Sequence, residues 1–169
     1  MFTIREAGPE TAELLCDLIR VSFQRQAEVL AIHEAEYPVY VAFETVERVR
    51  RRFEGGDYVL IAYEDGEPVG TVSARIELDQ PTAGYITRLA VLPEFRGQQY
   101  GDRLMAAAEA YLRSEGVKQA DISIVAAFDR LRNYYEGLGY RVRERGTVSV
   151  LPFEVDYMVK DLEEPDTTP

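Results

Sequence analysis

A short loop carries the residues best suited to chemistry. An apolar run at Leu89–Val91 is followed by Pro93, and the stretch 96–101, RGQQYG, then leads into an amphipathic segment. The first turn of a helix has N–H groups without intrahelical acceptors and the positive end of the helix dipole, so it binds phosphate well. Gly97 and Gly101 lack a Cβ and let the backbone approach a bulky anion. The loop predicts a phosphate-binding turn, although a plain tight turn with Gly97 at positive φ explains the same spacing.

This loop needs a strand before it and a helix after it, and the sequence pattern indicates both. Residues 83–91 are typical of a strand, and residues 99–114 of a helix that Gly116 ends. The apolar positions of that helix recur three or four residues apart: Leu104, Met105, Ala108, Tyr111 and Leu112. A further strand over 122–125 completes a strand–helix–strand unit, which predicts parallel strands and a right-handed connection.

The rest of the chain predicts a mixed α/β sheet with helices on both faces. We expect further strands at residues 2–4, 58–63, 69–78, 140–143 and 153–159. We expect helices beginning at Pro9, over 43–53 and over 129–138. Asp65-Gly66 predicts a hairpin turn, Gly55-Gly56 the end of a helix, and Val72, Ala74, Ile76 and Leu78 one face of a strand. One domain over 1–162 is expected, with an acidic flexible tail over 163–169.

Composition narrows the class of protein. Of 169 residues, 46% are hydrophobic and 29% charged, which excludes wholesale disorder. No apolar run approaches the ~18 residues of a membrane span, and the first residues lack a signal core, so we expect a cytoplasmic protein with no membrane partner. Cys16 is the single cysteine, which argues against a disulfide or a metal site. The net charge of −11 argues against nucleic-acid binding.

Several of these segments, in order, resemble the GNAT superfamily of N-acetyltransferases. The matching stretches are residues 2–7, Leu89-Ala90-Val91 with Pro93, Arg96-Gly97-x-x-x-Gly101, residues 135–140 and residues 157–160. The resemblance implies a GNAT-like mixed sheet of about seven strands, splayed between the fourth and fifth. It also implies acetyl-CoA as cofactor, an amine as acceptor and a homodimer as an assembly to test.

The resemblance also implies which residues hold acetyl-CoA. Backbone amides would hold its pyrophosphate, from Arg96, Gly97, Gln98, Gln99, Tyr100, Gly101 and Asp102. The backbone of Leu89, Ala90 and Val91 would pair with the pantetheine arm like an additional strand. The chain departs from the family pattern twice. Gln99 stands where the family has a glycine, and Phe128 stands where it often has an asparagine, so Asn133 is the candidate for that pantetheine contact.

Acetyl transfer to an amine needs a neutral amine, donors for the oxyanion and a proton for the thiolate. Tyr135 matches the family tyrosine that supplies this proton, with aromatic packing as the alternative, and a main-chain N–H near Leu89–Val91 would be the oxyanion donor. The base stays open, because Ile86-Thr87-Arg88 has no carboxylate where some relatives have one. Glu77, Asp79, the single histidine His33, partial desolvation and a water chain remain candidates.

Two clusters have a structural and a functional interpretation. The arginines at 48, 50, 51 and 52, beside Glu44 and Glu47, predict a solvated helix face with ion pairs, with phosphate or nucleotide binding as the alternative. The tyrosines at 37, 40, 58, 63 and 85 could line an acceptor pocket or pack in the core. We therefore expect a cytoplasmic acetyl-CoA-dependent N-acetyltransferase that acetylates a primary amine of a small molecule or peptide by direct attack in a ternary complex. The alternative is a non-catalytic acyl-CoA-binding module of the same fold.

Overall fold

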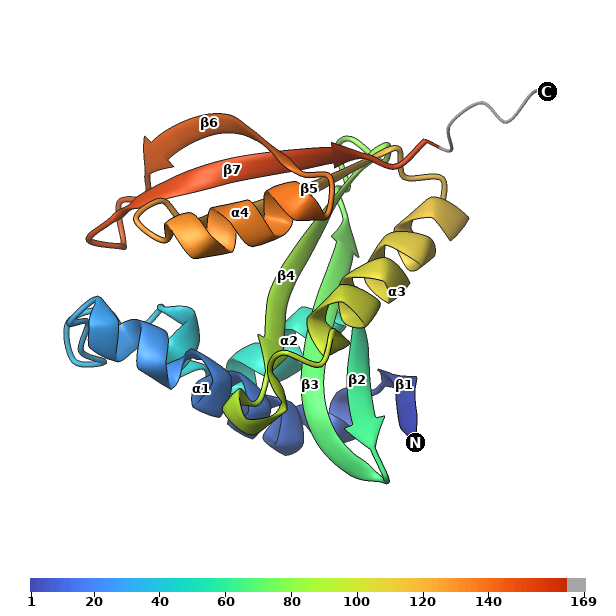
Figure 1. Ribbon diagram of the computed structural model, residues 1–169, viewed down its shortest axis with the longest axis horizontal. Helices are drawn as coiled ribbons and strands as arrows, with labels where there is room; N and C mark the ends of the chain where they lie inside the picture. Colours follow the sequence, from blue (N-terminus) through green and yellow to red (C-terminus); the bar gives the residue numbers. More distant parts are fainter. Residues whose placement is uncertain (164–169) are drawn as a thin grey trace. The chain divides into compact units, whose positions relative to one another are not determined.

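The computed structural model describes residues 1–163 and contains the elements in the predicted order (Figure 1). The strands are β1 (Phe2–Ala7), β2 (Tyr58–Glu64), β3 (Glu67–Ile76), β4 (Ala83–Val91), β5 (Gln119–Val125), β6 (Arg141–Thr147) and β7 (Glu154–Asp161). The α-helices are α1 (Ala12–Val29), α2 (Val46–Glu54), α3 (Tyr100–Ser114) and α4 (Asp129–Gly137). Except for Glu163, the predicted tail lies outside the described residues.

The strands form one mixed sheet in the order β1-β2-β3-β4-β5-β7-β6. The pairs β1–β2, β5–β7 and β6–β7 are antiparallel, and β4–β5 is parallel. The parallel register joins only Ala83–Tyr85 to Gln119–Asp121, whereas β5 pairs with β7 over all seven of its residues. Pairing confined to the start of β4 agrees with the splay expected between the fourth and fifth strands.

The chain gathers into two compact parts. The first contains residues 1–73 and 88–108, and the second contains residues 74–87 and the chain from Glu109 onward. Leu89–Val91 and Arg96–Asp102 belong to the first part, and Tyr135 and Asn133 belong to the second.

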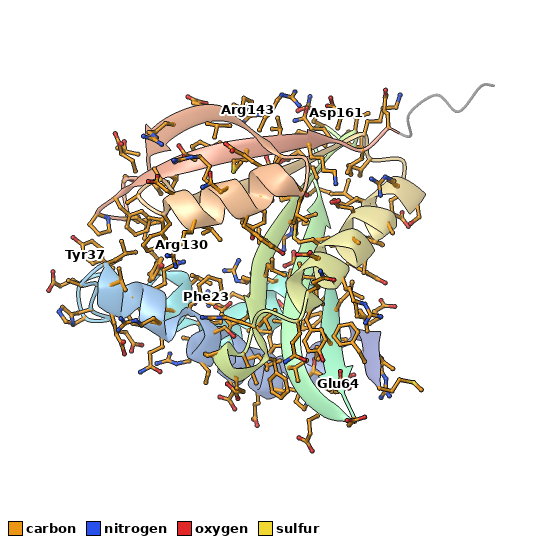
Figure 2. All side chains as sticks on the ribbon, viewed as in Figure 1. Phe23, Tyr37, Glu64, Arg130, Arg143 and Asp161 are labelled. Atoms are coloured by element: carbon orange, nitrogen blue, oxygen red, sulfur yellow. The ribbon has the colours of Figure 1, made fainter. Side chains whose placement is uncertain are left out.

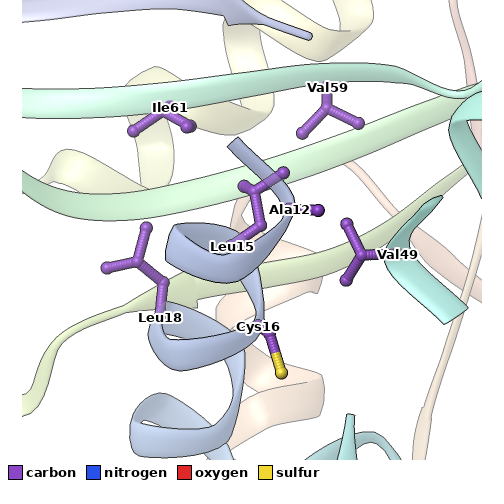
Figure 3. Packing of buried hydrophobic residues seen from close by; sticks show 7 residues of the cluster. All are labelled: Ala12, Leu15, Cys16, Leu18, Val49, Val59 and Ile61. Carbon is purple, nitrogen blue, oxygen red and sulfur yellow. The ribbon is translucent and has the colours of Figure 1, made fainter. Parts of the chain in front are cut away.

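In the first part, α1 and α2 pack against β2. The buried cluster in Figure 3 consists of Ala12, Leu15, Cys16 and Leu18 from α1, Val49 from α2, and Val59 and Ile61 from β2. Val59 and Ile61 are two residues apart and therefore point to the same face of the strand. Helix α2 begins at Val46 rather than at the predicted residue 43, because the Thr45 hydroxyl accepts the Arg48 N–H at 3.2 Å and caps the helix there.

The start of α3 lies on the opposite face of the same strand. The Tyr100 ring stacks on Phe2 with a centroid distance of 4.3 Å, and its hydroxyl donates to Glu64 at 2.6 Å. Phe2 and Glu64 are register partners, so their side chains lie on the same face of the sheet. Glu64 is an odd number of residues from Ile61 on β2, so it points to the face opposite the buried cluster. Glu64 is labelled on β2 in Figure 2. This alternation confirms the prediction of helices on both faces of the sheet.

In the second part, two ion-pair groups lie among the apolar contacts of β7 and its neighbours. Asp156 of β7 has no exposed side-chain surface and accepts from Arg145 Nε of β6 at 2.7 Å and from Arg132 Nη1 of α4 at 3.3 Å. Glu109 is also buried and accepts from Lys160 Nζ at 2.6 Å and from the Tyr140 hydroxyl at 3.4 Å. Such groups are costly to break singly, because the remaining charge stays buried.

Two local predictions have different outcomes. The Asp65-Gly66 turn is confirmed, with φ values of 49° and 85° that match the left-handed residues of a type I′ hairpin. The placement of Leu78 on a strand face is wrong, since β3 ends at Ile76 and Leu78 is 90% exposed.

Candidate functional site

The loop after β4 is fixed at its start to β3, in the same compact part. The Leu92 N–H donates to the Val69 carbonyl at 2.9 Å, and residues Pro93–Phe95 form a single 3-10 turn. The Arg96 N–H donates to the Pro93 carbonyl at 3.3 Å, and the Arg96 backbone is extended. The chain therefore leaves the strand through a rigid turn before the glycine-containing segment begins.

The segment that follows has two left-handed residues. Gly97 has φ +81° and Gln99 has φ +63°. The first helical bond of α3 runs from the Arg103 N–H to the Gln99 carbonyl at 3.2 Å, so the amides of Tyr100, Gly101 and Asp102 precede any intrahelical acceptor. A Cβ at Gly97 would meet nothing within 4 Å, so the glycine serves the backbone angle rather than the space. This geometry fits the predicted phosphate-binding turn.

The Arg96 side chain holds the loop in place. Its Nη2 donates to the Ser22 carbonyl of α1 at 2.7 Å, and its Nε donates to the Val91 carbonyl at 3.2 Å. The sequence predicted a backbone amide from this residue and gave no sign of a side-chain role. That role was not predictable, because Ser22 is 74 residues away along the chain.

Strand β4 contains a left-handed residue immediately before the segment expected to hold pantetheine. Arg88 has φ +55°, which interrupts the regular strand, and Leu89, Ala90 and Val91 follow it. Ala90 is buried, and Leu89 and Val91 are half-buried. A Cβ at Gly70 of β3 would lie 2.7 Å from the Ala90 carbonyl oxygen, so only glycine at that position allows this approach. An isolated glycine in a strand pattern is the sequence signal for such an approach.

Tyr135 is buried on α4, with 8% of its surface exposed. Its ring meets the rings of Tyr134 and Tyr140 edge to face, at centroid distances of 5.1 Å and 5.9 Å. Burial raises the pKa of the Tyr135 phenol well above its usual range, so the hydroxyl keeps its proton at neutral pH. Asn133 is exposed on the same helix, and Phe128 occupies the N-cap position of α4 without a side-chain cap bond.

The candidate bases lie in different settings. Glu77 is half-buried and accepts a hydrogen bond from the Tyr85 hydroxyl, which raises the pKa of Tyr85. Asp79 is exposed. His33 is exposed in a turn, where its carbonyl accepts the N–H groups of Glu36 and Tyr37. The geometry assigns the role of base to none of these residues.

The arginine-rich stretch of α2 differs from the prediction. Arg50 and Arg51 are exposed as expected, and Arg51 pairs with Glu47. The prediction of a solvated face is wrong for Arg48 and Arg52, which turn inward toward Glu44, a residue with 1% exposure. Arg48 and Arg52 are four residues apart on α2, so they lie on the same side of the helix.

Four arginines converge on Glu44. Arg48 Nε lies 3.2 Å from Oε1, and Arg52 Nη2 and Arg88 Nε lie 2.9 Å and 2.8 Å from Oε2. Arg20 Nη1 donates to the Glu44 backbone carbonyl at 2.9 Å. We name Glu44, Arg48, Arg52 and Arg88 the Glu44 cluster. Sequence reasoning missed Arg88 as a member, since nothing local connects residues 44 and 88.

A shallow pocket of about 360 Å³ lies elsewhere, in the second part. It is lined by Gln80, Thr82, Ala83, Lys118, Gln119, Asp161 and Glu163. These residues stand at the starts of β4 and β5 and the end of β7, and none is a predicted site residue. Over residues 1–163, His, Cys, Asp and Glu side chains form no group of three that could hold a metal ion. Within the same range, no helix is both long and apolar enough to cross a membrane.

Comparison with known proteins identifies the class to which this fold and loop belong. The model of the acetyltransferase (GNAT) family matches residues 24–140, which is more than half of the chain. The chain therefore belongs to the GNAT acetyltransferase family, as the sequence motifs predicted.

Two curated relatives and one solved structure are similar to this chain. An uncharacterized N-acetyltransferase of Archaeoglobus fulgidus is 34% identical over 94 residues, covering 53% of this chain and 64% of the relative. An aminoalkylphosphonate N-acetyltransferase of Salmonella typhimurium is 32% identical over 84 residues, covering 48% of this chain and 54% of the relative. The matches thus span between about half and two thirds of each relative's length.

The solved structure is the PaiA N-acetyltransferase of Thermoplasma acidophilum in complex with coenzyme A. It superposes with a TM-score of 0.73 at 19% identity, covering 95% of this chain and 99% of the other. At this identity the likeness shows a shared fold. It supports the predicted architecture of a mixed seven-stranded sheet with four α-helices.

Proposed function

We propose that this protein is an acetyl-CoA-dependent N-acetyltransferase that acetylates a primary amine of a small molecule or peptide by direct attack in a ternary complex. Family membership and the names of the two relatives support the reaction. The structural neighbour with bound coenzyme A supports the cofactor. The observation that carries the proposal is the loop from Gly97 to the start of α3, where two left-handed residues precede the first amides of a helix, an arrangement that suits a diphosphate.

Each predicted site residue has a defined role in this proposal. The amides of Arg96–Asp102 would hold the pyrophosphate, and the backbone of Leu89–Val91 and the Asn133 amide would hold the pantetheine arm. Acetyl-CoA supplies an activated thioester when bound. A main-chain N–H of Leu89–Val91 would stabilise the negative charge that develops on the carbonyl oxygen. The Tyr135 hydroxyl would donate its proton to the departing thiolate.

Two measurements test this function. Calorimetry with acetyl-CoA tests the cradle, and release of free thiol over a panel of amines tests transfer. Binding with thiol release for at least one amine supports the proposal. Binding without release for any amine favours the alternative, an acyl-CoA-binding module without catalysis. The absence of a carboxylate at Ile86-Thr87-Arg88 and the presence of Gln99 in the loop are the features that motivate this alternative.

The cradle itself can be tested with a matched pair of glycines. Gly97 and Gly116 have φ values of +81° and +82°, and an added Cβ meets nothing within 4 Å at either position. Gly97→Ala and Gly116→Ala therefore impose similar backbone strain at the two ends of α3. We expect Gly97→Ala to weaken acetyl-CoA binding about tenfold, because the free loop would leave the left-handed conformation to relieve about 1–2 kcal/mol of strain and would have to return to it on binding. Gly116→Ala should leave the affinity unchanged, and equal losses would show that the loop is not the binding element.

A further inference from the structure

The Glu44 cluster has more positive than negative charge. Three guanidinium groups, from Arg48, Arg52 and Arg88, surround one carboxylate, and Asp57 adds a second at 3.9 Å from Arg52 Nε. Three positive and two negative charges leave an excess of one positive charge in a partly buried setting. A buried charge is costly unless a partner of opposite sign balances it. The cluster therefore favours an additional anion.

Among the described residues, Arg88 is the member whose terminal nitrogens are both unbonded and not buried. The terminal nitrogens of Arg48 donate to the carbonyls of Pro38, at 2.9 Å, and Phe43. Arg52 contacts both Glu44 and Asp57. Within residues 1–163, Arg88 contacts Glu44 through Nε, and its Nη1 and Nη2 make no hydrogen bond. A quarter of its side chain is exposed, so these two nitrogens form a fork that a ligand can reach.

The position of Arg88 also indicates what kind of ligand it would meet. It stands directly before Leu89, where the proposed thioester-binding segment begins, and its φ of +55° is unusual for a residue with a long side chain. Strained backbone persists where the surrounding structure fixes it and is frequent at functional sites. Burial also lowers the pKa of Arg88, because the guanidinium has lost part of its hydration.

We propose that Arg88 binds an oxyanion group, a carboxylate or a phosphonate or phosphate, on the acceptor amine, while Glu44 holds the guanidinium in position. This inference rests on the proposed acetyltransferase function and specifies its acceptor class. A guanidinium fork matches such groups with two parallel hydrogen bonds. A protein of net charge −11 repels anionic molecules over most of its surface, so an anionic acceptor requires a local site of this kind.

The test compares acceptors that differ only in the acidic group. Thiol release is measured with 3-aminopropylphosphonate, 4-aminobutyrate and butylamine, using the wild-type protein, Arg88→Gln and Arg51→Gln. Arg51→Gln is the matched control, because this substitution removes the same charge from an exposed ion pair on α2. We expect the wild type to prefer one or both anionic amines over butylamine, and the pair of anionic amines separates a carboxylate from a phosphonate ligand.

Arg88→Gln should lower kcat/KM for the preferred anionic amine by about ten- to a hundredfold, the range of a charge-assisted hydrogen bond. It should change kcat/KM for butylamine by less than threefold, and Arg88→Lys should restore part of the preference. Arg51→Gln should match the wild type for all three amines. A wild type that prefers butylamine, or an equal loss for charged and neutral amines in Arg88→Gln, would overturn the inference.

A binding measurement separates this inference from the proposed reaction. Calorimetry with 3-aminopropylphosphonate and 4-aminobutyrate in the presence of coenzyme A needs no turnover, and circular dichroism checks that each variant is folded. Binding to the wild type and to Arg51→Gln, with at least a tenfold loss in Arg88→Gln, supports the anion site even where no amine is acetylated. If neither compound binds the wild type, the anion site is refuted, whether or not a neutral amine is acetylated. If Arg88→Gln fails to fold, Arg88→Lys is measured in its place. Its loss of affinity should be larger than that of Arg51→Gln and smaller than tenfold.

Discussion

At the scale of single residues, Gln99 has a backbone conformation that glycine would adopt more readily. Its φ of +63° costs a residue with a Cβ about 1–2 kcal/mol. The loop keeps this conformation because both sides are held, by Arg96 bonding to Ser22 and Val91 and by the Arg103 N–H bonding to the Gln99 carbonyl. The loop therefore holds Gln99 in a left-handed conformation at a cost in stability.

Replacing Gln99 by glycine should stabilise the protein. The relief of about 1–2 kcal/mol exceeds the loss of about 0.5–1 kcal/mol from the more flexible unfolded chain, so Gln99→Gly should raise the free energy of unfolding by about 0.5–1 kcal/mol. Urea denaturation measures the change. Gln98→Gly is the control, because Gln98 is exposed in the same loop and is not left-handed. It should lower stability, and a loss in both variants would contradict the account.

Tyr135 offers a second test at this scale. Tyr135→Phe removes one hydroxyl, so it should lower kcat by at least tenfold, since general acids contribute about 10²–10⁴ in rate. The affinity for acetyl-CoA should change little. Tyr134→Phe is the control, because the two rings are in contact and the substitution is the same. Steady-state kinetics and calorimetry provide both numbers, and an unchanged kcat in Tyr135→Phe would remove it from the role of acid.

At the scale of elements, Glu44 connects segments that are far apart in the sequence. Its side chain joins α2 to β4 through Arg48, Arg52 and Arg88, and its backbone carbonyl accepts from Arg20 and from the Cys16 thiol of α1. One buried residue thus sets the position of two helices and a strand within the first part. A buried carboxylate in such a network is hard to replace.

Neutralising this carboxylate should be strongly destabilising. Glu44→Gln leaves several guanidinium groups facing an uncharged partner, and breaking a buried ion pair costs about 3–5 kcal/mol. Glu47→Gln is the control, because Glu47 forms a single exposed pair with Arg51, a type of pair that contributes about 0–1 kcal/mol. Thermal and urea unfolding compare the two variants. Similar small losses in both would show that the cluster adds little to the stability of the first part.

Local patterns predicted most of the elements but few of the contacts that fix the site. The turn at Asp65-Gly66, strand β4 and the helix after the loop follow from short-range periodicity and turn residues, which one stretch of sequence contains. The inward turn of Arg48 and Arg52 depends on the burial of Glu44, which short-range periodicity does not show, and the ion pair of Arg88 with Glu44 joins residues 44 positions apart. The prediction for Leu78 was wrong for a related reason, because the alternation of apolar residues does not show where strand pairing ends.

At the scale of the whole molecule, acid should destabilise the fold through Asp156. Arg145 and then Arg132 hold the pKa of this carboxyl below its ordinary value of 3.8. A lowered folded-state pKa means that the stabilisation is complete above the unfolded value and is lost as pH falls through the folded value. We therefore expect the free energy of unfolding to fall below about pH 4.

Urea unfolding from pH 7 to pH 2 measures this dependence. Asp156→Asn should be less stable at pH 7 and should have a flatter profile below pH 4, because its side chain cannot take up the proton. Asp129→Asn serves as the control, since Asp129 pairs with the same Arg132 but is largely exposed, and its profile should follow the wild type. Parallel profiles for all three proteins would mean that other carboxyl groups govern the acid response.

The close approach at Gly70 limits how this protein can change over evolution or by design. The obstacle to a side chain there is the Ala90 carbonyl oxygen, which is part of the main chain and cannot rotate aside. Even alanine would move the strand as a body and shift the amides of its neighbours Leu89 and Val91 with it. Efforts to widen the enzyme for longer acyl groups should therefore leave this pair of strands intact and alter side chains around it.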